Sequence, residues 1–161
     1  ENVQNHIQKT KERYAFLLNG TSLHIIAPTI RCNQHCPYCF ASPKEMNSNI
    51  EETDMSLETA RKTVDFIMNS PSPALTLEFT GGEPLAAFER IQEMILYARD
   101  LNKKKKKDLQ FTIVTNLTLM TERIAKWLIE NNFPDGFQIL CFNCNQGKRL
   151  NNGTCPHMEI T

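Results

Sequence analysis

The feature that most constrains this fold is an alternation of strand-like and helix-like segments along the middle of the chain. Runs of β-branched and apolar residues predict three strands, at about 21–30, 74–80 and 109–116. A helical pattern of apolar positions follows each strand, at about 56–69, 87–101 and 121–130. This βαβαβα order is typical of a parallel sheet covered by helices, so we predict an α/β fold.

Motif-like stretches follow all three predicted strands. After the first comes a cysteine-rich stretch at 31–40, here named the cysteine loop, and after the second comes Gly-Gly-Glu-Pro at 81–84, here named the glycine turn. Thr115 and Asn116 end the third strand. Binding sites gather at the carboxyl ends of parallel strands, so we expect these stretches to face the same rim.

The composition permits a core but indicates no strongly charged partner. Hydrophobic residues make up 40% of the 161 residues, and the formal net charge is zero. We interpret the lysine run at 103–107 as a solvated turn rather than a nucleic-acid patch. No stretch approaches the roughly 20 apolar residues of a membrane span, and the polar N-terminal residues contain no secretory signal. We therefore expect neither a membrane nor a nucleic acid as partner, and the oligomeric state is left open.

The six cysteines fall into two groups of three that lie about a hundred residues apart. Tight groups with odd numbers of cysteines are more typical of ligand sets than of paired disulfides. Reduced thiolates in turn imply a reducing compartment, so we expect a cytoplasmic protein.

The first group is Cys32, Cys36 and Cys39 in the cysteine loop. A tetrahedral zinc site needs four ligands, and His35 lies between two of the cysteines, where ligation would strain so short a loop. Three thiolates can instead hold an iron–sulfur cube that leaves one iron open for a cofactor or a substrate. Three unliganded cysteines in one loop are the less favoured interpretation.

The spacing Cys-x3-Cys-x2-Cys, with Tyr38 just before the last cysteine, resembles the signature of radical SAM enzymes. The resemblance implies a [4Fe–4S] cluster on the three cysteines, with S-adenosylmethionine bound at the open iron near Tyr38. It also implies an electron donor and reductive cleavage of the sulfonium to a 5′-deoxyadenosyl radical. The hard chemistry would then belong to the cofactor, and the protein would place it and exclude water.

The glycine turn resembles the second motif of the same family, which approaches the methionine end of the cofactor. The resemblance implies that Gly81, Gly82 and Glu83 bind the cofactor. Glycines let backbone groups come close, and a carboxylate can accept hydrogen bonds from the cofactor's ammonium. Thr115 and Asn116 would face the same rim, although a Thr-Asn pair at a strand end is also a common turn former.

A closer resemblance, over about residues 14–125, is to the radical SAM maturases of His-Xaa-Ser peptide systems. It implies a ribosomally made peptide as the substrate. That family's barrel continues with three or more further βα units, so we predict a truncated, partial (βα) barrel of about three units. Its strand edges and apolar interior would be open. Whether such a chain is an active enzyme, or is completed by another chain, is left open.

The second cysteine group, Cys141, Cys144 and Cys155, forms a four-ligand set with His157. Two short pairs separated by a Gly- and Asn-rich stretch are typical of zinc knuckles, and Zn²⁺ could fold a segment with few apolar residues. The alternative is a disordered tail with incidental cysteines. The segment also resembles the zinc-binding C-terminal piece of phage-type HNH endonucleases, without their catalytic histidine segment.

These observations predict an N-terminal extension at 1–20, a partial radical SAM core at 21–132 and a zinc-binding tail at 133–161. The first hypothesis is a fragment of a radical SAM enzyme. The second is a zinc-binding module whose barrel remnant is inert, with Lys148 and Arg149 as its only indication of nucleic-acid contact. The third is a non-functional chimera that does not fold stably.

Overall fold

The computed structural model describes residues 2–14, 20–37, 39 and 41–131. The chain divides into two compact units, Glu1–Thr115 and Asn116–Thr161. The first unit contains, in order, α1 (Asn2–Arg13), β1 (Leu23–Thr29), α2 (Ile50–Thr53), α3 (Leu57–Met68), β2 (Ala74–Gly81), the 3₁₀ helix η2 (Pro84–Ala87), α4 (Phe88–Lys105) and β3 (Asp108–Ile113). The second unit contains α5 (Glu122–Glu130).

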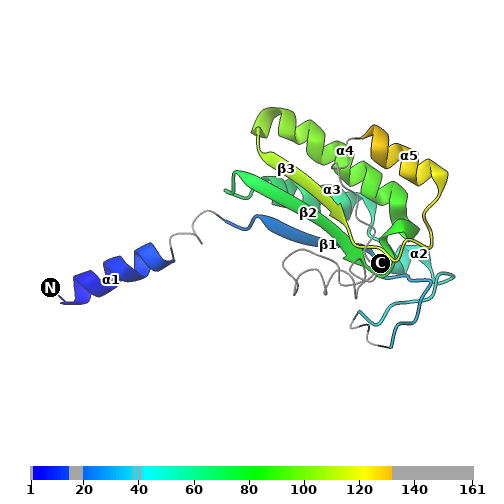
Figure 1. Ribbon diagram of the computed structural model, residues 1–161, viewed down its shortest axis with the longest axis horizontal. Coiled ribbons are helices and arrows are strands. Elements are labelled where there is room, and N and C mark those ends of the chain that lie inside the picture. Colours follow the sequence, from blue (N-terminus) through cyan, green and yellow to red (C-terminus); the bar gives the residue numbers. More distant parts are fainter. Residues whose placement is uncertain (1, 15–19, 38, 40, 132–161) are drawn as a thin grey trace, which may run out of the picture. The chain divides into compact units, whose positions relative to one another are not determined.

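The three strands form one parallel sheet in the order β1-β2-β3. Their arrows run in the same direction in Figure 1, so the carboxyl ends of the strands lie at one edge. Ile26 lies beside Phe79, and Leu77 lies beside Phe111. The predicted α/β fold with three parallel βα units is confirmed.

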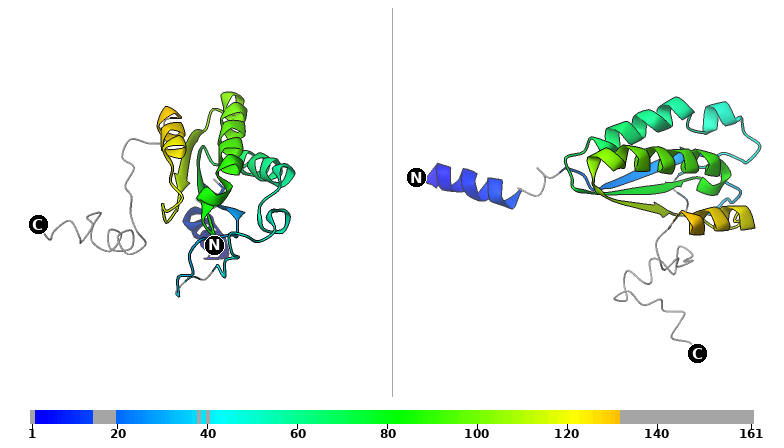
Figure 2. Two further views of the ribbon diagram at one scale, coloured as in Figure 1. Left: turned by 90° about the vertical axis from the view of Figure 1, so that its right-hand side faces the viewer. Right: turned by 90° about the horizontal axis from the view of Figure 1, so that it is seen from above.

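One face of the sheet is covered by α3 and α4 (Figure 2). The buried side chains of this layer come from the strands and from both helices: Ile26, Leu75, Leu77, Phe79, Phe111, Val64, Ile67, Ile91 and Ile95. Each side chain of this size contributes about 1.5–3 kcal/mol when it is fully removed from water. On the other face Ile25 is 63% exposed, so within the described part of the first unit that face is open.

Two of the helices begin at the residues that the sequence predicts. The Ser56 hydroxyl accepts a hydrogen bond from the backbone N–H of Thr59 (3.1 Å) and caps α3. The Thr121 hydroxyl accepts one from the N–H of Ile124 (3.3 Å) and caps α5. By contrast, α1 and α2 are not predicted from the sequence, because α1 is mostly polar and α2 is a single turn.

The lysine run is more than a solvated turn. Helix α4 continues through Lys105, and Lys106 then adopts a left-handed conformation with φ of 56° that ends the helix. The Nζ of Lys107 donates to the carbonyl oxygens of Ser70 (2.7 Å) and Ser72 (2.6 Å). Lys107 therefore stabilises the connection between α3 and β2, which corrects the interpretation of the whole run as solvated.

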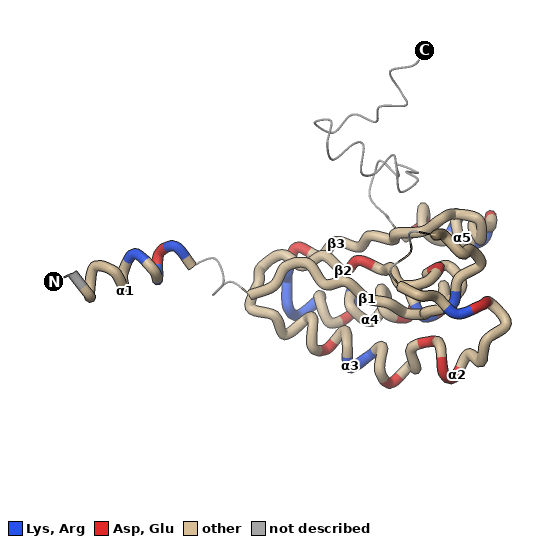
Figure 3. Tube along the Cα trace, turned by 90° about the horizontal axis from the view of Figure 1, so that it is seen from below, with Lys and Arg blue, Asp and Glu red and all other residues tan. Residues whose placement is uncertain are grey.

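Side chains of both charges lie along α3 (Figure 3). Lys62 pairs with Glu58 within the helix (2.6 Å), and Arg61 pairs with Glu93 of α4 (3.0 Å). Both pairs are largely exposed to solvent, so each contributes little to the free energy of unfolding, about 0–1 kcal/mol.

Candidate functional site

The glycine turn at the end of β2 is bonded to the start of the cysteine loop at the end of β1. The backbone N–H of Gly82 donates to the carbonyl oxygen of Thr29 (3.0 Å). The N–H of Glu83 donates to the carbonyl oxygen of Arg31 (2.7 Å), the residue directly before Cys32. Two of the predicted motifs, from neighbouring strands, therefore lie against each other at the strand-end edge.

Both glycines of the turn are required by this close approach. Gly81 has a φ of 113°, which side chains of L-residues rarely allow, and a Cβ at this position would lie 2.5 Å from the carbonyl oxygen of Thr29. A Cβ on Gly82 would overlap the carbonyl group of Arg31. The structure thus shows that the glycines let the turn reach the cysteine loop, and their contact with a cofactor stays a prediction.

The cysteine loop presents three free thiols. Cys32 and Cys36 are half-buried and Cys39 is exposed. The N–H of Cys32 donates to the carbonyl oxygen of Lys44 (2.8 Å), which holds the backbone of Cys32 beside the returning chain. The described residues between 33 and 39 include one bend and one turn and no helix or strand.

The chemistry of this donor set fits an iron–sulfur cluster, because such clusters are held by thiolates and the three thiols are free. Their sulfurs do not converge in this structure. Among the described residues, no three His, Cys, Asp or Glu side chains gather closely enough to hold a metal ion. Binding of one cluster by all three cysteines would therefore need a different arrangement of these thiols.

Glu83 is turned inward at the start of η2. Its carboxylate is almost fully buried, at 1% exposed, and its Oε1 accepts hydrogen bonds from the N–H of Leu85 (3.0 Å) and the hydroxyl of Thr115 (2.6 Å). The structure therefore brings together two residues that the sequence places at one rim. The contacts show a carboxylate that caps η2 and joins the ends of β2 and β3.

Asn116 belongs to the second unit. Its Oδ1 accepts hydrogen bonds from the N–H (3.0 Å) and the hydroxyl (2.6 Å) of Thr118. These contacts are those of a turn former, the alternative that the sequence left open for this position.

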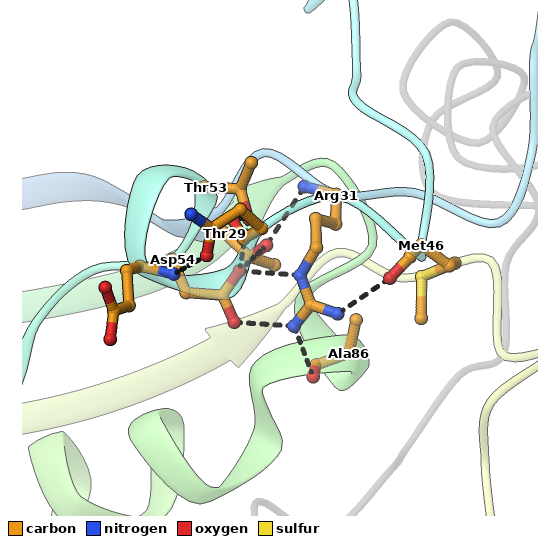
Figure 4. Close-up of polar contacts among 8 residues, drawn as sticks. Thr29, Arg31, Met46, Thr53, Asp54 and Ala86 are labelled. Carbon is orange, nitrogen blue, oxygen red and sulfur yellow. Dashed lines mark hydrogen bonds and ion pairs between the residues drawn. The ribbon is translucent and has the colours of Figure 1, made fainter.

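A buried ion pair joins Arg31, the first residue of the cysteine loop, to Asp54 (Figure 4). The Nε of Arg31 donates to Oδ1 of Asp54 (2.8 Å), and its Nη2 forms an ion pair with Oδ2 (2.6 Å). The Arg31 side chain is 8% exposed and the Asp54 side chain is 13% exposed. The Thr29 hydroxyl also donates to Asp54 Oδ1 (2.6 Å) and accepts from the N–H of Arg31 (2.9 Å).

The pair shifts the pKa of both partners. Burial by itself would raise the pKa of Asp54, but hydrogen bonds from Arg31, Thr29 and Thr53, together with the charge of Arg31, lower it below the usual 3.8. The hydrogen bond to Asp54 raises the pKa of Arg31. Both groups are therefore held in their charged forms.

Sequence reasoning misses this pair. Its members are 23 positions apart, and Asp54 ends a polar stretch without any motif. One signal for the pair is present in the sequence. Arg31 lies between a buried strand end and the first cysteine, where a charged side chain needs an oppositely charged partner.

Several predicted site residues lie outside the residues that the structure describes. They are Tyr38 of the cysteine loop and the four residues of the predicted zinc site, Cys141, Cys144, Cys155 and His157.

With this geometry established, comparison with known proteins identifies the class. Residues 26–140 match the Radical SAM superfamily, and the chain belongs to that superfamily. An uncharacterized protein of Methanocaldococcus jannaschii is 32% identical over 123 residues, which cover 76% of this chain and 40% of that protein.

Two further similarities are to a sulfatase-maturating enzyme and to a solved structure. The cysteine-type anaerobic sulfatase-maturating enzyme of Clostridium perfringens is 32% identical over 120 residues, which cover 73% of this chain and 32% of that enzyme. The solved structure of native anSMEcpe with bound AdoMet and Cp18Cys peptide matches with a TM-score of 0.55 at 30% identity, over 69% of this chain and 29% of that one. The chain thus spans two fifths or less of the length of these relatives.

Proposed function

We propose that the cysteine loop binds a [4Fe–4S] cluster through Cys32, Cys36 and Cys39, and that the chain is the cluster-binding part of a radical SAM enzyme. The observation that carries this proposal is the position of three free thiols after β1, in a loop bonded to the glycine turn, within a chain of this superfamily. The chemistry that a bound cluster would supply is one-electron reduction of S-adenosylmethionine.

The glycine turn is the proposed site for the methionine end of S-adenosylmethionine. Gly81 and Gly82 pack closely against the backbone of Thr29 and Arg31, which brings the turn next to the cysteine loop. Glu83 and Thr115 hold the turn in place through their buried hydrogen bond, and Glu83 is the proposed acceptor for the cofactor's ammonium. Tyr38 and Asn116 are the remaining proposed contacts.

A peptide is the proposed substrate. The solved relative contains a bound peptide, and the open face of the sheet offers a surface with Ile25, Glu78 and Thr112 in one row. A ribosomally made peptide of a His-Xaa-Ser system is the specific form of this proposal. Turnover would also need an electron donor, and reduced thiolates fit a cytoplasmic setting.

The decisive experiment is anaerobic reconstitution with iron and sulfide. We expect a reducible cluster with a broad visible absorbance and an EPR signal in the wild-type protein, and loss of both in Cys36→Ala. Cys144→Ser is the matched control, because it removes a thiol outside the loop and should keep all the iron. A full cluster in Cys36→Ala would contradict the assignment, since three thiolates are required.

The Cys144→Ser variant also tests the proposed zinc site of the tail, because that site and the cysteine loop use different cysteines. If Cys144 is a zinc ligand, Cys144→Ser should lose zinc while its iron content stays unchanged.

A membrane span needs a helix of sufficient length and hydropathy. None of the helices in the described residues meets both requirements.

A further inference from the structure

The guanidinium of Arg31 reaches three segments of the chain from a position directly before the first cysteine. Besides its two bonds to Asp54, its Nη1 donates to the carbonyl oxygen of Met46 (3.2 Å) and its Nη2 to the carbonyl oxygen of Ala86 (3.4 Å). Asp54 precedes α3, Met46 lies in the chain that returns from the cysteine loop, and Ala86 lies in η2, directly after the glycine turn. One side chain therefore ties the loop to the elements on both of its sides.

The backbone of Arg31 is held as firmly as its side chain. Its N–H donates to the Thr29 hydroxyl (2.9 Å), and its carbonyl oxygen accepts from the N–H of Glu83 (2.7 Å). The next residue is Cys32, whose N–H is bonded in turn to Lys44 (2.8 Å). The position of the first thiol relative to the glycine turn thus depends on contacts of Arg31.

Stability alone does not explain a buried ion pair at this place. Removing two charges from water is costly, and apolar side chains of similar volume often serve as well or better in the same space. Apolar side chains cannot provide directional bonds to a carboxylate and to two carbonyl oxygens at once, whereas a planar guanidinium can. The pair is therefore suited to fixing geometry.

We propose that Arg31 and Asp54 are positioning residues that hold Cys32 in register with the glycine turn. Their role is to keep the site of the iron–sulfur cluster and the site of S-adenosylmethionine at a fixed placement relative to each other. This proposal rests on the proposed function, because it assumes that a cluster binds to the cysteine loop and the cofactor to the turn.

The test uses the full chain with Arg31→Met combined with Asp54→Leu, which removes both charges and so leaves no buried charge unpaired. Circular dichroism and thermal unfolding establish that the variant folds. After anaerobic reconstitution, iron content is measured, and S-adenosylmethionine is titrated while the EPR signal of the reduced cluster is followed. Loss of outer-shell partners typically weakens a metal site by about 10- to 100-fold, so we expect half-maximal spectral change at a concentration at least about tenfold higher.

Arg61→Gln with Glu93→Gln is the matched control, because it removes an arginine–carboxylate pair that joins α3 to α4. This control should keep the wild-type iron content and titration midpoint. Arg31→Lys keeps the charge but loses the planar fork, so its midpoint should fall between those of the wild type and the double variant. If the double variant does not fold, Arg31→Lys decides the question by the same titration.

The outcomes separate this proposal from the proposed function. Iron loss in a folded double variant, or the expected shift of its titration midpoint, supports the positioning role. Wild-type iron content and an unchanged midpoint in the double variant would overturn it and leave the proposed function standing. A wild-type protein that binds no iron, or whose signal does not respond to S-adenosylmethionine, would overturn both.

Discussion

In the core beneath α3 and α4, Leu77 and Phe79 are completely buried among apolar side chains. At the strand-end edge, the buried residues Thr29, Arg31 and Glu83 are polar or charged, and each forms hydrogen bonds. Apolar burial is not directional, so a core tolerates other side chains of similar volume. Hydrogen bonds and ion pairs require defined distances and angles, so the edge can hold a precise arrangement for chemistry. The comparison teaches that stability and positioning are supplied by different regions of one small sheet.

The largest loss of stability is expected from the core. Phe79→Ala should lower the free energy of unfolding by about 3–5 kcal/mol, because it removes a buried ring and leaves a cavity. Urea denaturation measures this change. In the fraction that remains folded, iron binding by the cysteine loop should be unchanged. If Phe79→Ala lost iron while it remained folded, the proposed division between the two regions would be wrong.

A somewhat smaller loss of stability is expected when only the carboxylate of the buried Arg31–Asp54 pair is removed. Asp54→Asn leaves the Arg31 charge without its carboxylate and should cost about 3 kcal/mol at neutral pH, the low end for a buried pair. The pKa of Asp54 is lower in the folded protein than in the unfolded chain, where it is about 3.8. The charged carboxylate therefore contributes its full share to the free energy of unfolding above the unfolded pKa, and this share is lost as the pH falls through the folded pKa. The stability difference between wild type and variant should therefore be constant above about pH 5 and shrink below pH 4. Urea denaturation at several pH values checks this, and a difference that grew on acidification would refute the assigned sign.

Gly82→Ala tests the strand-end edge through the close packing of its backbone. Its Cβ would overlap the carbonyl group of Arg31, so the turn must move away from the cysteine loop. We expect a cost of about 1–3 kcal/mol, typical of overpacking, together with a weaker spectral response to S-adenosylmethionine. Thermal unfolding and the EPR titration measure the two effects. A wild-type response in Gly82→Ala would show that the close approach is unnecessary.

The smallest effect is expected at the surface of the helices. Arg61→Gln with Glu93→Gln should change the free energy of unfolding by less than about 1 kcal/mol, because the pair is exposed and water replaces its interaction. Chemical denaturation at low and high salt measures the change. A loss as large as that of Asp54→Asn would mean that burial does not distinguish the two arginine–carboxylate pairs.

The sequence by itself determines the features that depend on neighbouring residues. Alternating apolar runs place the three strands, Ser56 and Thr121 place two helix starts, and cysteine spacing places the first candidate ligands. These signals are local, because capping, strand periodicity and loop spacing all act over a few positions. The resemblance to radical SAM enzymes, which superfamily membership confirms, also depends on such short motifs.

Only the tertiary structure decides which distant groups meet. Arg31 finds its carboxylate 23 positions away, and Glu83 accepts a hydrogen bond from Thr115, 32 positions away. The glycines of the turn, which the family resemblance implies as cofactor contacts, are required by the backbone at the end of β1 and at the start of the cysteine loop. The parallel register of β1, β2 and β3 brings these residues into contact. That register is set because one face of the whole sheet is buried beneath α3 and α4. No local pattern contains this information, because the partner of each buried polar group depends on the packing of the entire unit.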